Sequence, residues 1–206
     1  MPVWSGIDAA PDQSRAAVVA CDQSGVVEPV RQDNKVGWVA DVVEDLWGSG
    51  HASGVCVLSP GPLKHLLPRL RTFGEQYKVS DAEGKLVVPV LALPPYGNAE
   101  ASQLFLQAVL DRSVHVVFSA GVFIEANSQS RRRKVGETGG FTIARADEET
   151  ECSALVAAAL AYYAATAEGW QYATEEAKKG RSVDALTAWG DSLASEDIRD
   201  PDYWGD

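Results

Sequence analysis

The stretch VWSGIDAAPDQSRAAVVACDQSGVVEPV, residues 3–30, decides how the rest of the chain is interpreted. Three short apolar runs are separated by the turn sequences Ala-Pro-Asp-Gln and Asp-Gln-Ser-Gly, which predicts a meander of three antiparallel strands. The first run ends in a carboxylate, Asp8. Taken alone, an Asp before a Pro-Asp turn is more often a turn residue than a functional one. The alternative is that the fold requires a charge at this place for chemistry.

Beyond residue 35 the spacing of apolar residues alternates between helical and strand periods. Short apolar runs predict strands, and amphipathic or Ala-rich segments predict helices. We expect strands over 53–59, 85–93, 114–119 and 139–146, and helices over 36–50, 61–74, 97–113, 120–134 and 153–169. Pro68 should kink the second helix, and Asn98 should be the N-cap of the third. The last helix is apolar nearly all round and should be buried.

Composition and charge narrow the class of protein. The chain has 206 residues, of which 46% are hydrophobic and 23% charged, which is typical of one globular domain with a large core. The chain shows neither a membrane-length apolar stretch nor a secretory signal. The cysteines Cys21, Cys56 and Cys152 form no CxxC pair, so we expect no zinc site and a reducing cytoplasm.

The formal net charge of −11 argues against a general nucleic-acid coat protein, which is normally basic. More than half of the excess negative charge lies in residues 166–206, which also carry Trp170, Trp189 and Trp204. The remaining body is only mildly acidic. Such a body can still bind DNA locally, especially where its carboxylates hold metal cations.

Six segments, in collinear order, resemble the nuclease domain of the phage terminase large subunit as found in many actinobacterial phages. Each segment is short, and their order and spacing carry the resemblance. The segments are GIDAAPDQSRAAVVA (6–20), VGWVADVVEDL (36–46), VCVLSPGPLKHLLPRL (55–70), YGNAEASQLFLQAVLDRSVHV (96–116), RRRKVGETGGFTIAR (131–145) and ECSALVAAALAYYA (151–164).

The resemblance and the element order together imply an α/β, ribonuclease H-like fold. In it, three antiparallel strands precede parallel strands in one mixed sheet, and helices cover both faces. We expect a nuclease domain over residues 1–166, followed by an acidic, Trp-containing extension over residues 167–206.

The function implied is phosphodiester hydrolysis assisted by Mg²⁺ or Mn²⁺. Two such ions about 3.5–4 Å apart can activate a water and stabilise the leaving oxygen, and both prefer carboxylate ligands. By resemblance, Asp8 supplies the first catalytic ligand and Glu151 the third. Asp147 is a further candidate ligand, with Glu148 and Glu149 as alternatives. Taken alone, Glu151 would be an ordinary acidic residue at a helix start.

The second ligand position departs from the family pattern. The family places an Asp at the end of the fourth strand, where this chain has Ser59. A serine hydroxyl carries no charge and is a poor substitute. Three alternatives follow: the site binds one ion, an acid such as Glu44 or Asp45 takes the position, or the nuclease is weak or inactive.

A basic run precedes the last predicted strand. It consists of Arg131, Arg132, Arg133 and Lys134, and Arg145 follows in the next segment. Such a run is usually a solvated face, but beside a glycine loop it can bind DNA phosphates. We therefore regard these five residues as candidate contacts to double-stranded DNA.

Three functions remain open. The first is a metal-dependent endonuclease module that cleaves concatemeric phage DNA during packaging, in the host cytoplasm if phage-encoded. The chain has no Walker A motif, so this role needs an ATPase on another chain, besides a portal or small terminase partner. The second is a catalytically degenerate ribonuclease H-like module that binds DNA or a partner protein. The third is a nuclease resembling junction resolvases.

Overall fold

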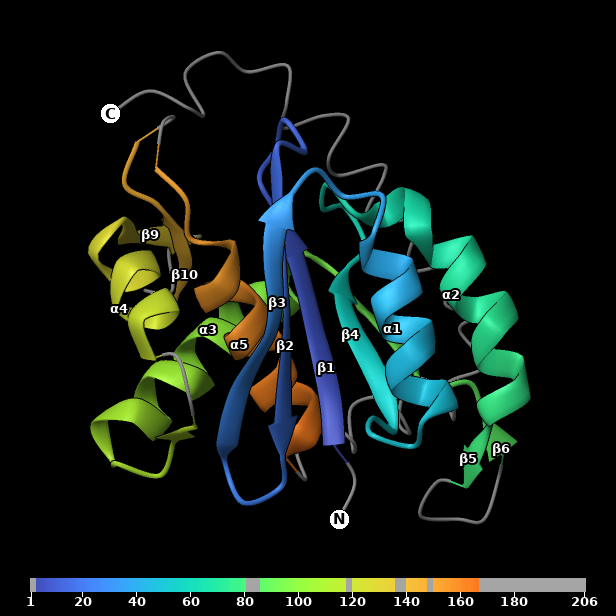
Figure 1. Cartoon of the computed structure of the whole chain (residues 1–206). Helices are drawn as coiled ribbons and strands as arrows, with labels where there is room; N and C mark the ends of the chain where they lie inside the picture. Colours follow the sequence, from blue (N-terminus) through green and yellow to red (C-terminus); the bar gives the residue numbers. More distant parts are fainter. Residues whose placement is uncertain (1–2, 81–85, 118–119, 136–139, 148–149, 167–206) are drawn as a thin grey trace.

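A six-stranded mixed sheet is the centre of the computed structural model, with helices on both faces (Figure 1). The structure describes residues 3–80, 86–117, 120–135, 140–147 and 150–166. Its helices are α1 (Val39–Gly48), α2 (Leu67–Gly74), α3 (Pro95–Leu110), α4 (Ala120–Ser128) and α5 (Ser153–Ala165). Its strands are β1 (Val3–Ala9), β2 (Arg15–Asp22), β3 (Val26–Asn34), β4 (Gly54–Leu58), β5 (Val79–Ser80), β6 (Leu86–Val87), β7 (Val90–Leu93), β8 (His115–Val116), β9 (Ser130–Val135) and β10 (Gly140–Arg145). The predicted extension, residues 167–206, lies outside the described residues.

The strand order of the main sheet is β7-β4-β1-β2-β3-β8. The first three strands form the expected antiparallel meander, because β1 pairs with β2 and β2 with β3. On the other side of β1, strands β4 and β7 follow in parallel, and β8 adds a short parallel pairing to β3. The predicted ribonuclease H-like order of antiparallel and then parallel strands is therefore confirmed.

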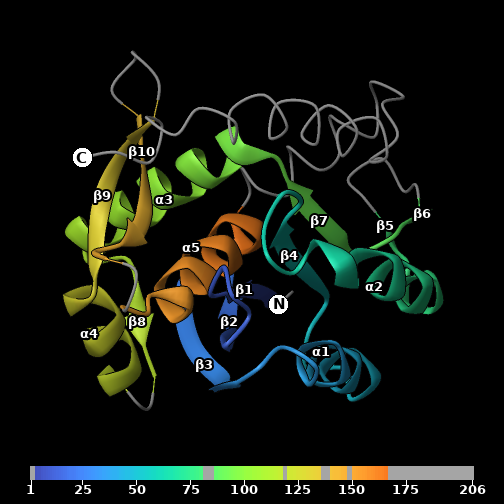
Figure 2. The same ribbon diagram turned by 90° about the horizontal axis from the view of Figure 1, so that it is seen from above.

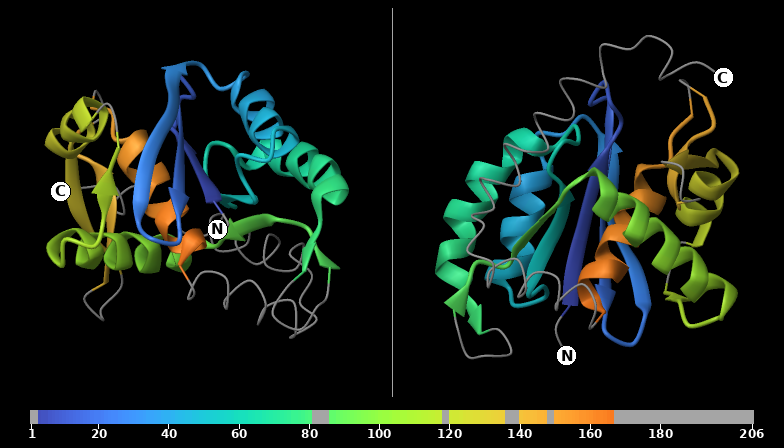
Figure 3. Two further views of the ribbon diagram at one scale, coloured as in Figure 1. Left: turned by 60° about the horizontal axis from the view of Figure 1, so that its bottom comes forward. Right: turned by 180° about the vertical axis from the view of Figure 1, so that it is seen from behind.

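Two hydrophobic clusters fill the two sides of the sheet. One lies under α1 and α2 and includes Ile7, Val18 and Leu70. The other lies under α3, α4 and α5 and includes Val19 and Phe105. Figures 1 and 3 show the two helical layers on opposite sides of the strands.

Helix α5 lies unusually close to β1, as the Ala-rich sequence allows. A Cβ atom added at Gly6 would come within 1.9 Å of the Ala157 carbonyl oxygen and 2.5 Å of the Ala161 nitrogen. Only glycine on the strand permits this approach. The contact sets the position of the helix start relative to the end of β1, where Asp8 lies.

The predicted helix over 120–134 is wrong in its second half. Helix α4 ends at Ser128, and residues 130–135 form β9, which pairs antiparallel with β10. Arginine and lysine favour helices in isolation, but pairing with residues 140–145 overrides that preference. Serine 102 of α3 anchors this ribbon, because its Oγ accepts a hydrogen bond from the Ile143 N–H at 3.1 Å. The basic run therefore lies on a β-ribbon (Figure 2).

Three smaller expectations also differ from the structure. Pro68 does not kink a long helix, because α2 begins only at Leu67 and places the proline in its first turn. Asn98 is not an N-cap, since α3 already begins at Pro95. The strand expected over 85–93 is divided: residues 86–87 pair with β5, and only residues 90–93 join the main sheet. Among the described residues, each helix is too short or too polar to cross a membrane.

Candidate metal and DNA site

Asp8 lies at the end of β1, on the face that α5 covers. The strand alternation places it on the side of Gly6, and its neighbour in β2, Ala17, belongs to the cluster under α5. Ile7 points the other way, into the cluster under α1 and α2. Asp8 itself is half-buried. The charge is thus held between the sheet and the start of α5.

Glu151 lies two residues before the first residue of α5. Its backbone N–H donates to the Gln129 side-chain oxygen at 2.8 Å, and its own carboxylate accepts the Ser153 N–H at the helix start. These two bonds fix the approach of the chain into the helix. The sequence alone indicates no role for Gln129, because nothing in it links this residue to one 22 positions away.

The two predicted catalytic carboxylates lie within electrostatic range of each other. The pKa of Asp8 lies well above its usual value, mainly because the carboxyl is buried. A hydrogen bond from the Ala9 N–H lowers the pKa, and the negative charge of Glu151 raises it. The positive charge of Arg145 lowers it, with a smaller effect. Burial and a neighbouring like charge disfavour the ionised carboxylate. A bound cation would reverse this effect, as it does at carboxylate metal sites.

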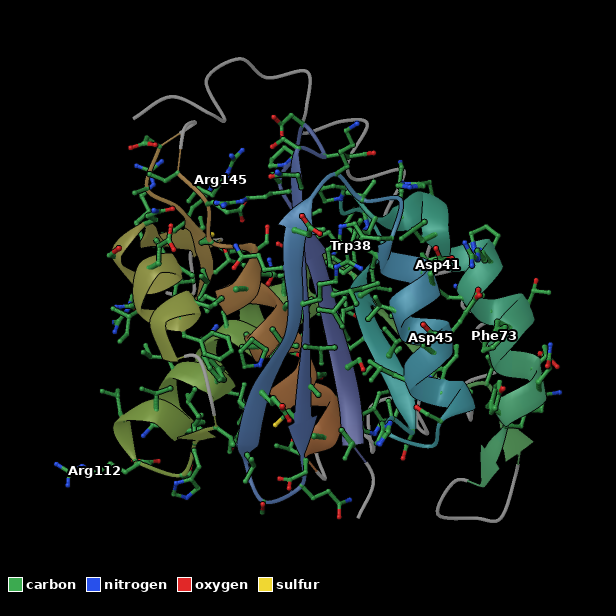
Figure 4. All side chains as sticks on the ribbon, viewed as in Figure 1. Trp38, Asp41, Asp45, Phe73, Arg112 and Arg145 are labelled. Carbon is green, nitrogen blue, oxygen red and sulfur yellow. The ribbon has the colours of Figure 1, made fainter. Side chains whose placement is uncertain are left out.

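Arg145, the last residue of β10, brings positive charge to the same place. Its Nη1 donates to the Thr150 carbonyl at 3.2 Å, so it is attached to the segment that leads into Glu151. It also lowers the pKa of the exposed Asp12, after the larger effect of the hydrogen bonds from Ser14. Figure 4 shows Arg145 at the upper end of the sheet, on the side of β9 and β10.

Cys152 lies beside these charges and is almost completely buried. Burial, together with the smaller effects of the negative charges of Asp8 and Glu151, raises the pKa of its thiol to about 12. The thiol is therefore protonated at neutral pH and is not a thiolate ligand. The site offers hard oxygen ligands, which suit Mg²⁺ or Mn²⁺ rather than a soft metal.

The end of β4 brings no carboxylate to Asp8. Its last residue, Leu58, packs in the cluster under α5, and Ser59 follows it. Ser59 is buried, and its backbone N–H donates to the Leu93 carbonyl at 2.8 Å. The position expected to hold the second acid therefore lies beside β1, as β4 pairs with β1, but carries only a hydroxyl.

The two acids considered as replacements lie on the opposite face of the sheet. Glu44 of α1 accepts a hydrogen bond from the Arg69 Nε at 2.7 Å, and Arg69 also bonds Asp41. Asp45 is exposed on the same helix. Figure 4 shows Asp41 and Asp45 on α1, across the strands from Arg145. The structure therefore does not bring Glu44 or Asp45 to Asp8.

Asp147 occupies an exposed turn between β10 and α5. Its carboxylate accepts the Thr150 N–H at 2.8 Å, and the Thr150 hydroxyl donates to its carbonyl at 3.1 Å. These bonds shape the turn that leads to Glu151. The alternative ligands Glu148 and Glu149 lie outside the described residues.

The basic run is divided between the two faces of the β9–β10 ribbon. Directly opposite residues of an antiparallel pair point to the same face. Arg145 pairs with Ser130, so it shares a face with Arg132 and Lys134, whereas Arg131 and Arg133 lie on the other. The Arg132 guanidinium lies 5.1 Å from the centre of the Phe141 ring. All four residues of the run are exposed or half-exposed.

The donors brought together fit one divalent ion better than two. Within the described part of the chain, no three His, Cys, Asp or Glu side chains are grouped so that they could hold a metal. Mg²⁺ is commonly bound by one or two carboxylates, with water and substrate phosphate completing its shell. Asp8 and Glu151 would supply two such carboxylates, enough for one ion.

Comparison with known proteins agrees with the fold. No protein-family model matches the sequence, and no curated protein does. Among solved structures, the magnesium-bound large terminase nuclease of thermophilic phage G20c superposes with a TM-score of 0.53 and 18% identity, covering 78% of this chain and 80% of that one. The large terminase nuclease domain of Thermus phage P74-26 gives a TM-score of 0.52 and 15% identity, covering 79% of each chain.

The chain therefore has the fold of large terminase nuclease domains, as the sequence resemblance predicted. A cobalt-bound structure of the G20c nuclease superposes as well, with a TM-score of 0.50 and 14% identity. At these identities the similarity establishes the fold, and the chemistry has to be argued from the residues of this chain.

Proposed function

We propose that this chain is a metal-dependent endonuclease module that cleaves double-stranded DNA during phage genome packaging. The observation that carries the proposal is that Asp8, at the end of β1, and Glu151, just before α5, lie within electrostatic range of each other and of Arg145. Their proximity on a terminase nuclease fold, whose relatives include magnesium- and cobalt-bound structures, supports a divalent ion at these carboxylates.

Each residue then has a defined role. Asp8 and Glu151 hold the ion, which when bound supplies Lewis-acid activation of water and stabilises the leaving oxygen. Asp8, held against α5, would release its proton to solvent when an ion binds, because a nearby cation favours the ionised carboxylate. Arg145, Arg132 and Lys134, which share a ribbon face, contact phosphates and orient the duplex.

The role of Asp8 is tested by nicking of supercoiled plasmid with Mn²⁺ or Mg²⁺. We expect the wild type to nick DNA and Asp8→Asn to lose at least about 100-fold of the rate, which corresponds to roughly 2.7 kcal/mol of transition-state stabilisation. Asp45→Asn, an exposed acid on the opposite face, is the matched control and should nick as the wild type does. Equal rates for Asp8→Asn and wild type would reject the proposal.

The DNA face of the ribbon gives a second test of the same function. Reversing charge in the double variant Arg132→Glu/Lys134→Glu should weaken DNA binding more than the double variant Arg131→Glu/Arg133→Glu, because only the first pair shares a face with Arg145. Each lost phosphate contact should also reduce the salt dependence of binding by about one unit of slope. Equal effects would place the DNA elsewhere.

A catalytically degenerate module that binds DNA or a partner protein is the second candidate. Ser59 favours it, because the end of β4 offers no charge. If this candidate is correct, the wild-type protein should bind DNA but should not nick it in the presence of metal.

The third candidate is a resolvase-like nuclease. Such an enzyme should cut a four-way junction in preference to linear duplex. The packaging role further requires an ATPase, for which residues 1–206 carry no Walker A motif, and the host cytoplasm remains the predicted location.

A further inference from the structure

We propose that Arg145 acts as the second cation of this site, so that the centre contains one divalent ion and one guanidinium instead of two ions. This inference rests on the proposed metal-dependent function and specifies how that function operates without an acid at position 59.

The position of Arg145 supports this role. It ends β10, is half-buried, and its Nη1 donates to the Thr150 carbonyl at 3.2 Å, one residue before Glu151. The pairing of Arg145 with Ser130 directs it to one defined ribbon face. The guanidinium is thus held next to Glu151, by strand β10 on one side and by the Thr150 carbonyl on the other.

The charges of the site agree with one ion. With an ion bound, Asp8 and Glu151 would contribute two negative charges, and Arg145 would offset one of them. Ser59 adds none, and Glu44 and Asp45 lie across the sheet. A second divalent ion would enter beside a fixed positive charge with no carboxylate of its own. A guanidinium can supply the charge stabilisation for a phosphoryl oxygen that such an ion would give.

A role in DNA binding alone, or in holding the turn alone, makes a different prediction. In those cases Arg145 would affect duplex affinity or folding but not the number of bound ions. Metal binding without DNA therefore separates the roles. Arg132 serves as the matched control, because it lies on the same ribbon face but opposite Ile143, two residues further from the end of β10.

The experiment is calorimetric titration of the folded full chain with Mn²⁺ in the absence of DNA. We expect one ion per chain for the wild type, at least about tenfold tighter binding for Arg145→Gln, and wild-type affinity for Arg132→Gln and for Arg145→Lys, which keeps the charge. The double variant Ser59→Asp/Arg145→Gln should bind two ions. Thermal melting of each variant confirms that it is folded.

Nicking assays complete the test. Arg145→Gln should lose at least about 30-fold of the rate despite its tighter ion, and Arg145→Lys should recover part of it. Two ions bound to the wild type, or unchanged Mn²⁺ affinity in folded Arg145→Gln, would overturn the inference and leave the nuclease proposal standing. Absence of Mn²⁺ binding by the wild type would overturn both.

Discussion

On the α1–α2 face of the sheet, Ile7 and Val18 pack against helices with branched and aromatic side chains, including Leu70. On the other face, Gly6 meets Ala157 of α5 at backbone distance. On the first face, large side chains fill the space between sheet and helices and exclude water. Charged groups such as the Arg69–Glu44 pair remain at its outer surface. On the second face, the contact between β1 and α5 is made by small residues, and it brings the start of α5, with Glu151 just before it, toward Asp8 at the end of the strand.

The difference between the two faces indicates that one face mainly stabilises the fold and the other positions the proposed site. Large side chains hold helices at a distance and form the bulk of the core. Small side chains allow a helix start to reach the strand that bears a carboxylate. We expect substitutions on the first face to change stability alone, and substitutions on the second to change the geometry or charge of the site.

The largest effect is expected at Gly6. Gly6→Val places a branched side chain where even a Cβ would lie 1.9 Å from the Ala157 carbonyl oxygen, so α5 has to move away. We expect a loss of more than about 5 kcal/mol, measured as the free energy of unfolding in urea. The control is Gly37→Val, where an added Cβ meets nothing within 4 Å. A stable Gly6→Val protein would show that α5 does not need this close approach.

The α1–α2 face should respond to the loss of volume. Leu70 of α2 is completely buried, so Leu70→Ala should lower the free energy of unfolding by about 2–5 kcal/mol through lost burial and a residual cavity. Leu110→Ala is the control, because Leu110 is 64% exposed. Mn²⁺ affinity of folded Leu70→Ala should equal that of the wild type. A weakened metal site in this variant would mean that the two faces are not separate.

Asp8 should destabilise the metal-free protein at neutral pH. Because burial raises its pKa in the folded state, the folded chain keeps this proton at pH values where the unfolded chain has lost it. The stability contribution of Asp8 is therefore complete below about pH 3.9, the unfolded value, and is lost as the pH rises through the folded pKa.

The Asp8→Asn side chain does not ionise, so this variant does not lose stability as the pH rises. In a chelator, its melting temperature should exceed that of the wild type at pH 7.5, and the gap should close as the pH falls toward 4. Excess Mn²⁺ should reverse the order, since only the wild type gains a bound ion. A variant that melts below the wild type in the chelator would show that Asp8 is stabilising when ionised.

The smallest effect is expected at the outer surface of the first face. Arg69 bridges Asp41 and Glu44, but its side chain is 48% exposed. Exposed ion pairs contribute little and are screened by salt. Arg69→Gln should melt within a degree or so of the wild type in 0.5 M salt, by calorimetry. A large decrease in melting temperature that does not depend on salt would show that this ion pair contributes substantially to stability.

The sequence predicted the central sheet and α5 well, because apolar periods and the glycine and proline turns act locally. The prediction from sequence failed where strand pairing between separate segments determines the local structure. A single helix was expected over residues 120–134. The structure instead has a helix followed by a strand, because residues 130–135 pair with residues 140–145. The same pairing holds Arg145 against the Thr150 carbonyl, next to Glu151, whereas the sequence indicated it as a DNA contact or as a partner of the acids beside it. Asp8 and Glu151 were predicted only through the family resemblance.

The most direct test of the central claim is Mn²⁺ binding followed by electron paramagnetic resonance of the free ion. If Asp8 and Glu151 hold one ion together, the wild type binds Mn²⁺, and Asp8→Asn and Glu151→Gln each bind it at least about tenfold more weakly, a change of roughly 1.4 kcal/mol. Asp45→Asn should match the wild type. Wild-type affinity in either Asp8→Asn or Glu151→Gln would contradict the account.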